Sequence, residues 1–176
     1  MQQRRPGFPA RISLPTPGQR PVSGSTTRSG TLPGVPVPAG LGLDSAAVRA
    51  RMVQRLSATG VTAPQVLQAM GSVERHRFVD TGLVNQAYED TSLPIGLGQT
   101  ISKPSIVARM AELLLGAEIV RSTGGLGRVL EVGTGCGYQA AVLSKLAREV
   151  YSMERLRGLH DQARDNLRPL RLATVH

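Results

Sequence analysis

A cluster of three glycines stands between an apolar run and an amphipathic one in the stretch RVLEVGTGCGYQAAVL. These glycines are Gly133, Gly135 and Gly137. Glycine loses conformational entropy when it is ordered, so this density indicates a tight turn or a backbone that a ligand approaches closely. An acid lies on each side of the turn: Glu131 comes before it and Glu154 ends the next apolar run. We therefore expect a ligand-binding turn faced by two carboxylates.

The elements around this turn alternate. We expect strands at residues 128–132 and 149–154, helices at 138–147 and 155–168, and an apolar segment that starts at 172. Strand–helix alternation predicts a parallel sheet with right-handed crossovers. In such doubly wound α/β sheets, ligands lie beyond the carboxyl ends of the strands, above the first strand-to-helix turn. The glycine cluster occupies that turn.

The spacing of the glycines and the two acids narrow the class of ligand. The dinucleotide fingerprint GxGxxG has its third glycine one residue later, where this sequence has Tyr138, so the helix is expected to begin at Gly137. Glu154 is placed to accept hydrogen bonds from ribose hydroxyls, and Glu131 suits an ammonium-bearing group, whereas both acids would repel a pyrophosphate. An adenosine-type ligand is favoured over a dinucleotide. The alternative is a turn without function, with Glu154 as an exposed acid.

Two helices and a long loop precede this region. The first helix, within residues 44–60, has Asp44 or Ser45 as a candidate cap, and Thr62 is the candidate cap of a second helix that ends near residue 73. Residues 89–103 show no clear period, and a loop of this length inside a compact domain is often functional. A third helix follows, with Ser102 as its candidate cap.

Composition divides the 176-residue chain into unlike parts. Residues 1–43 hold eight of the twelve prolines and five arginines but no acid, so we expect a disordered basic tail, with an organellar transit peptide as an alternative. Five of the nine net positive charges lie in this tail, and aromatic residues make up only 3%, which disfavours nucleic-acid binding except by the tail. No apolar run reaches the about 18 residues of a membrane span. One cysteine, Cys136, agrees with a reducing compartment, and we expect a cytoplasmic protein.

Several motifs together resemble one enzyme family. LEVGTGCGYQ resembles the first motif of class I S-adenosylmethionine-dependent methyltransferases. LPIGLGQTISKPSIVARM, with RFVD upstream and MERLRGL downstream, resembles protein-L-isoaspartate O-methyltransferases specifically. The resemblance runs from about residue 48 to residue 176. It implies a Rossmann-like α/β fold, preceded by a small helical region, and S-adenosyl-L-methionine as the cofactor.

The resemblance also implies the reaction and the site. The family methylates the carboxylate of L-isoaspartyl residues in damaged proteins, which are thereby repaired. Matched motif by motif, the cofactor residues are Glu131, Gly133, Thr134, Gly135, Gly137 and Glu154. Thr100, Ile101 and Ser102 match the segment over the reacting carboxylate, and Ser102 is the candidate for direct contact; a helix cap alone is the alternative for Ser102. Since a carboxylate is already a nucleophile, no metal is expected.

The chain ends earlier than the resemblance implies. Family members continue beyond the equivalent of residue 176 through an adenine-contacting loop and further strands, so we expect an incomplete fold with weak cofactor affinity. Three regions are predicted: the tail 1–43, a helical region with the substrate-site loop 44–124, and a partial S-adenosylmethionine-binding region 125–176. The alternative function is a truncated, noncatalytic protein that at most binds S-adenosyl ligands. A complete chain is expected to be a monomer that acts on isoaspartyl proteins.

Overall fold

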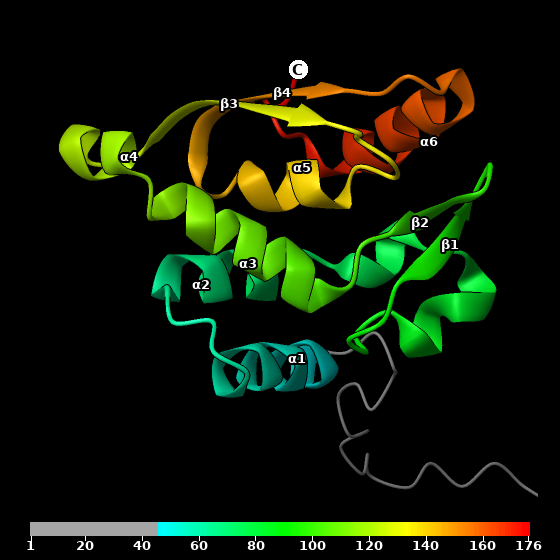
Figure 1. Cartoon of the computed structure of the whole chain (residues 1–176). Helices are drawn as coiled ribbons and strands as arrows, with labels where there is room; N and C mark the ends of the chain where they lie inside the picture. The colour runs from blue at the N-terminus through cyan, green and yellow to red at the C-terminus, as the bar shows by residue number, and fades with distance from the viewer. Residues whose placement is uncertain (1–45) are drawn as a thin grey trace, which may run out of the picture. The chain divides into compact units, whose positions relative to one another are not determined.

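The structure, a computed structural model, describes residues 46–176, which all belong to one compact unit. The predicted tail and the candidate caps Asp44 and Ser45 lie outside the described residues. Within the described part, a layer of helices lies on one side and a small sheet with its own helices lies on the other (Figure 1). None of the helices between residues 46 and 176 is long and apolar enough to cross a membrane.

Three helices form the helical layer: α1 (Ala46–Ala58), α2 (Pro64–Ser72) and α3 (Pro104–Leu115). All three pack against one another, with Met52 of α1, Met70 of α2 and Val107 of α3 buried between them. Two 3-10 helices, η1 (Arg75–Phe78) and η2 (Thr81–Gln86), continue from α2. The three helices expected from apolar periodicity are confirmed.

The predicted caps Thr62 and Ser102 are wrong. In both helices a proline takes the first helical position, so the cap is the residue just before it, Ala63 in α2 and Lys103 in α3. Distant carboxylates satisfy the free amides instead. Glu112 Oε1 of α3 accepts from the Ala63 amide at 2.9 Å, and Asp90 Oδ1 accepts from the amide of Ser105 at 2.8 Å.

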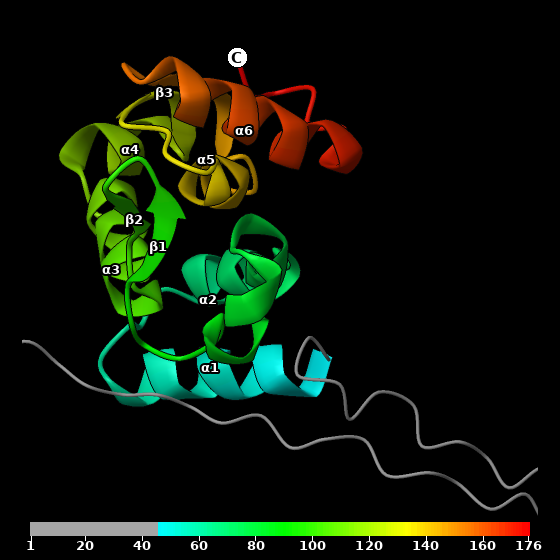
Figure 2. The same ribbon diagram turned by 90° about the vertical axis from the view of Figure 1, so that its right-hand side faces the viewer.

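The segment that showed no period contains a β-hairpin rather than a plain loop. β1 (Leu93–Gly96) pairs antiparallel with β2 (Gln99–Ile101). Gly96, Leu97 and Gly98 at its tip all have positive φ, which glycine adopts without strain. Strands of this length are too short to show a period of two, which is why the sequence did not reveal them. Figure 2 shows the hairpin extending from the helical layer towards the sheet.

The sheet region begins after a short helix, α4 (Glu118–Thr123). β3 (Leu126–Val132) pairs in parallel with β4 (Ala147–Met153) through the crossover helix α5 (Tyr138–Leu143), and α6 (Arg157–Leu167) with the 3-10 helix η3 (Arg168–Leu170) follows. The last residues lie along the other edge of β4, with Val175 bridged in parallel to Val150. The predicted parallel order is confirmed, and the fold is an incomplete Rossmann-like α/β fold.

The two faces of this sheet differ. Val129 and Val150 are buried on the face that α5 covers, whereas the opposite face exposes Leu130, Val132, Tyr151 and Met153. Within residues 46–176 no other strand pairs with the free edge of β3. The predicted boundary between residues 124 and 125 stays a prediction. Helices α5 and α6 share a core cluster with the helical layer, whereas Val129 and Val150 of the strands belong to a second cluster.

Candidate functional site

The glycine turn joins β3 to α5 and is anchored to the end of β4. The amide of Gly133 donates to the Met153 carbonyl at 2.8 Å, and the amide of Gly137 donates to the Thr134 carbonyl at 2.9 Å. Gly133, Gly135 and Gly137 have φ values of 93°, 56° and 92°, a region that side chains with a Cβ rarely adopt. The helix expected to begin at Gly137 begins one residue later, at Tyr138, and Gly137 is the cap residue before its first turn.

The three glycines serve different purposes. A Cβ at Gly133 would meet no atom within 4 Å, so this glycine leaves open space beside the turn. A Cβ at Gly135 would lie 3.2 Å from Ile95 of the hairpin, and one at Gly137 would lie 3.0 Å from Leu167 of α6. The missing side chain of Gly137 therefore allows close packing against α6, whereas Gly133 borders open space.

Glu131 is the buried carboxylate of the site. Its exposed fraction is 4%, and its Oε2 accepts a hydrogen bond from the Ser152 hydroxyl. Its Oε1 is buried and has no partner among residues 46–176. Burial raises the pKa of Glu131 to about 7, although the Ser152 hydroxyl and the Gln139 amide act in the opposite direction. A buried carboxylate with an oxygen to spare suits a cationic ligand.

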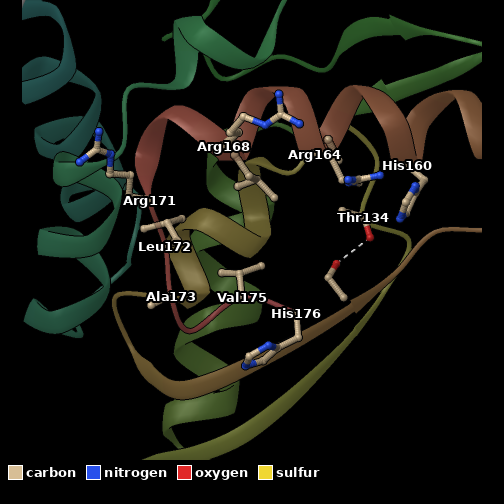
Figure 3. Close-up of a pocket in the computed structure, with 12 residues that line it drawn as sticks. Thr134, His160, Arg164, Arg168, Arg171, Leu172, Ala173, Val175 and His176 are labelled. Atoms are coloured by element: carbon tan, nitrogen blue, oxygen red, sulfur yellow. Dashed lines mark hydrogen bonds between the residues drawn. The ribbon is translucent and has the colours of Figure 1, made fainter.

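Sequence reasoning missed Ser152. Its hydroxyl also lies 2.6 Å from that of Thr134, the bond drawn as a dashed line in Figure 3. Thr134 and Ser152 also line a neighbouring cavity of about 530 Å³. His160, Arg164 and His176 line other parts of the same cavity. A polar residue at an inward position of a buried strand was the available signal, because Ser152 follows Val150 by two residues.

A cavity of about 170 Å³ brings most of the predicted residues together. Its predicted members are Thr100, Ile101, Ser102, Glu131, Gly133, Thr134 and Gly135. Ile95 of β1, Val107 and Met110 of α3, and Gln139 of α5 also line it, none of which was predicted. Ile101 is buried, whereas Thr100 and Ser102 are exposed at the cavity wall. Gly137 and Glu154 do not line this cavity.

Glu154 lies at the end of β4 and already has two backbone partners. Its Oε2 accepts from the Gly135 amide at 2.9 Å, and its Oε1 accepts from the Leu156 amide at 2.9 Å. These hydrogen bonds, with that of Leu156 first, lower the pKa of Glu154. The carboxylate thus holds the glycine turn against the start of α6, and each oxygen keeps a lone pair for a further donor.

A buried arginine supports the floor of the site. Arg75 is fully buried, its guanidinium lies 4.8 Å from the centre of the Tyr138 ring, and its Nε donates to the Ala87 carbonyl at 2.7 Å. Burial lowers the pKa of Arg75, and nearby Tyr138 acts against that shift. Tyr138 in turn lines the cavity. Sequence reasoning did not single out Arg75, because arginine is rarely buried without a carboxylate partner.

Comparison with known proteins gives consistent matches. The family model for protein-L-isoaspartate(D-aspartate) O-methyltransferase (PCMT) matches residues 47–176. The protein-L-isoaspartate O-methyltransferase of Methylibium petroleiphilum is 54% identical over 185 residues, which cover 99% of this chain and 66% of the relative. That of Leptothrix cholodnii is 59% identical over 160 residues, which cover 90% of this chain and 54% of the relative. The chain therefore spans less than two thirds of the length of either relative.

Two solved structures share the fold. A protein-L-isoaspartate O-methyltransferase superposes with a TM-score of 0.57 at 27% identity, over 72% of this chain and 40% of the other. A Plasmodium falciparum protein described as a protein-L-isoaspartate O-methyltransferase, solved in complex with S-adenosyl-L-homocysteine, gives a TM-score of 0.59 at 23% identity, over 72% of this chain and 60% of the other. The second likeness concerns the fold alone.

Proposed function

The chain belongs to the protein-L-isoaspartate(D-aspartate) O-methyltransferase (PCMT) family, and from this premise we propose that it methylates the carboxylate of L-isoaspartyl residues in damaged proteins, with S-adenosyl-L-methionine as the methyl donor. The observation that carries the proposal is the cavity in which Glu131 and the glycine turn meet the Thr100–Ser102 segment. One wall suits a cationic nucleoside and the other suits a peptide carboxylate, which are the two reactants of this methyl transfer.

The residues present fit an S-adenosyl group. Glu131 Oε1, which has no partner in the described part of the chain, would accept from the ammonium of the methionine moiety, and the space beside Gly133 would admit that moiety to the backbone. Glu154 would hold the ribose through the lone pairs that Gly135 and Leu156 leave free. When bound, S-adenosyl-L-methionine supplies an already activated methyl group.

The remaining task of the protein is alignment. A carboxylate is a nucleophile at neutral pH, so the reaction needs correct placement of its oxygen, and alignment of two reactants can supply roughly 7 to 11 kcal/mol. Ser102 and Thr100 are exposed at the cavity wall, and neither hydroxyl donates to another residue between 46 and 176. These hydroxyls would orient the isoaspartyl carboxylate without neutralising it.

The setting of the reaction is part of the same proposal. We place it in the cytoplasm and infer that a monomer carries it out on isoaspartyl-containing proteins. The transfer joins the methyl carbon to a carboxylate oxygen, breaks its bond to sulfur and leaves S-adenosyl-L-homocysteine. A backbone amide nitrogen then attacks the methyl ester and expels methanol to give a succinimide, which water reopens in part to normal aspartate.

Transfer of tritiated methyl groups to an isoaspartyl peptide tests the proposal, with the peptide that contains normal aspartate as the substrate control. We expect labelling of the isoaspartyl peptide alone. Ser102→Ala should lower kcat/KM by roughly 10- to 100-fold, the usual effect of one hydrogen bond to a charged group. Ser105→Ala is the matched variant, since Ser105 lies three residues further along, in the first turn of α3, and does not line the cavity.

The outcomes separate the candidate functions. Equal labelling of both peptides would remove the substrate assignment. Binding of S-adenosyl ligands without any transfer would favour the noncatalytic alternative.

A further inference from the structure

Glu131 and Ser152 occupy paired positions in the parallel ladder of β3 and β4. The Ser152 hydroxyl donates to Oε2 of Glu131, and the hydroxyls of Ser152 and Thr134 lie 2.6 Å apart. A serine has one hydroxyl proton, and the ionised carboxylate receives it, so Thr134 must donate the proton of the second bond. The hydrogen bonds therefore run in one direction, from Thr134 to Ser152 to Glu131.

These hydrogen bonds leave the two carboxylate oxygens of Glu131 in different environments. Oε2 is held by Ser152, whereas Oε1 is buried and without a partner in the described structure. We propose that Ser152 is a positioning residue for the S-adenosyl ligand: its hydroxyl, oriented by Thr134, fixes the Glu131 carboxylate in its ionised form so that Oε1 receives the cationic end of the ligand. This inference rests on the proposed function.

The surroundings of Glu131 explain why one hydroxyl matters. The turn contributes Cys136, α5 contributes Tyr138 and Gln139, α3 contributes Val107 and Met110, and the hairpin contributes the Thr100–Ser102 segment. Burial raises the pKa of Cys136 and that of Tyr138, so neither carries charge at neutral pH. Among residues 46–176, no lysine or arginine lines this cavity.

An arginine and two histidines do occur on the other side of the hydroxyl pair. There α6 contributes His160 and Arg164, and the chain ends with His176 (Figure 3). Thr134 and Ser152 line the same cavity as these groups, and the Ser152 hydroxyl donates to Glu131, whose pKa the Gln139 amide also lowers. Loss of the Ser152 hydroxyl should favour the protonated form of Glu131, which cannot attract a cation.

Calorimetric binding of S-adenosyl-L-homocysteine to the full chain between pH 5.5 and 9 tests this role. For Ser152→Ala we expect a dissociation constant about tenfold higher than that of the wild type near pH 6. The ratio of the two constants should approach one towards pH 9, because the pKa of Glu131 should have risen by about one unit in the variant. Comparing both proteins at the same pH cancels the titration of the ligand itself.

Three further variants guard against a merely structural effect. Ser152→Thr keeps the hydroxyl and should restore affinity to within about threefold of the wild type, and Thr134→Val should shift the profile in the same direction as Ser152→Ala but less. Ser144→Ala removes another partly buried hydroxyl, which donates to the Ala141 carbonyl, and should match the wild type. Thr134→Val and Ser152→Thr carry the test if Ser152→Ala fails to fold.

The results distinguish this inference from the proposed function. A wild-type chain that binds no S-adenosyl ligand would overturn both. A wild-type chain that binds, together with a Ser152→Ala affinity ratio that is constant across pH or close to one, would overturn the role of Ser152 alone. So would a Ser152→Thr protein that behaves like Ser152→Ala.

Discussion

Two glutamates, one in the helical layer and one in the sheet region, have opposite surroundings. Glu112 of α3 has both oxygens occupied: Oε1 accepts from the Thr62 and Ala63 amides at 2.6 and 2.9 Å, and Oε2 accepts from Arg109 at 2.7 Å. These donors, led by the Ala63 and Thr62 amides, lower the pKa of Glu112 to about 2. Glu131 has one hydroxyl on one oxygen, and burial raises its pKa to about 7.

Glu112 therefore stabilises the fold, whereas the surroundings of Glu131 agree with the ligand-binding role proposed for it. The negative charge of Glu112 is stabilised by the donors around it at the start of α2. The negative charge of Glu131 is buried and has no cationic partner among residues 46–176, so ionisation of Glu131 lowers the stability of the fold at neutral pH. Proteins retain such unfavourable groups chiefly at functional sites, where a ligand supplies the missing partner.

Glu131→Gln should give the largest effects. Without the negative charge, affinity for S-adenosyl-L-homocysteine should fall by roughly 100-fold, the upper range for one charged hydrogen bond. Stability should change in the other direction. The pKa of Glu131 is raised in the folded state from 4.5 to about 7, so the wild type loses stability as pH rises through that window, by about 3 kcal/mol in all. Glu131→Gln should not show this loss.

Chemical denaturation of both proteins at pH 4 and pH 8, without ligand, measures the effect. The curves should nearly coincide at pH 4, and the variant should be the more stable protein at pH 8. If the difference in unfolding free energy between the two proteins were the same at pH 4 and pH 8, Glu131 would not be buried as the structure has it. The contrast with Glu112 would then be lost.

The sequence predicted the elements of the sheet region better than the details of its site. Glu131 and the glycine turn follow from a strand, turn and helix pattern that is local in the chain. Ser152 and Glu112 act on residues far away in sequence, Glu131 and Thr62 respectively, so no local pattern reveals them. The misplaced cap at Ser102 has the same origin, because Asp90 supplies the acceptor from outside the helix.

Two glycine substitutions should have effects of intermediate size. Gly133→Ala and Gly137→Ala impose the same positive φ on alanine, which costs about 1 to 2 kcal/mol. Gly137→Ala also places a Cβ 3.0 Å from Leu167, and such overpacking adds about 1 to 3 kcal/mol, so it should destabilise the fold more. Gly133→Ala fills the open space beside the turn and should instead weaken S-adenosyl-L-homocysteine binding more. Chemical denaturation ranks the two variants by stability, and calorimetry ranks them by affinity for S-adenosyl-L-homocysteine. The opposite order in either measurement would contradict the roles given to the two glycines.

Glu112→Gln should have the smallest effect, because a glutamine oxygen can still accept from the Thr62 and Ala63 amides. What the variant loses is the charge. Since the pKa of Glu112 is lowered from 4.5 to about 2 in the folded state, the contribution of that charge is complete above pH 4.5 and disappears as pH falls towards 2. The Tm of the variant should thus lie below that of the wild type at pH 7 and approach it as the pH is lowered to 3, the reverse of the pH dependence expected for Glu131→Gln. If the Tm difference between the wild type and Glu112→Gln grew as the pH was lowered, the charge of Glu112 would not stabilise the fold. The contrast between Glu112 and Glu131 would then be wrong.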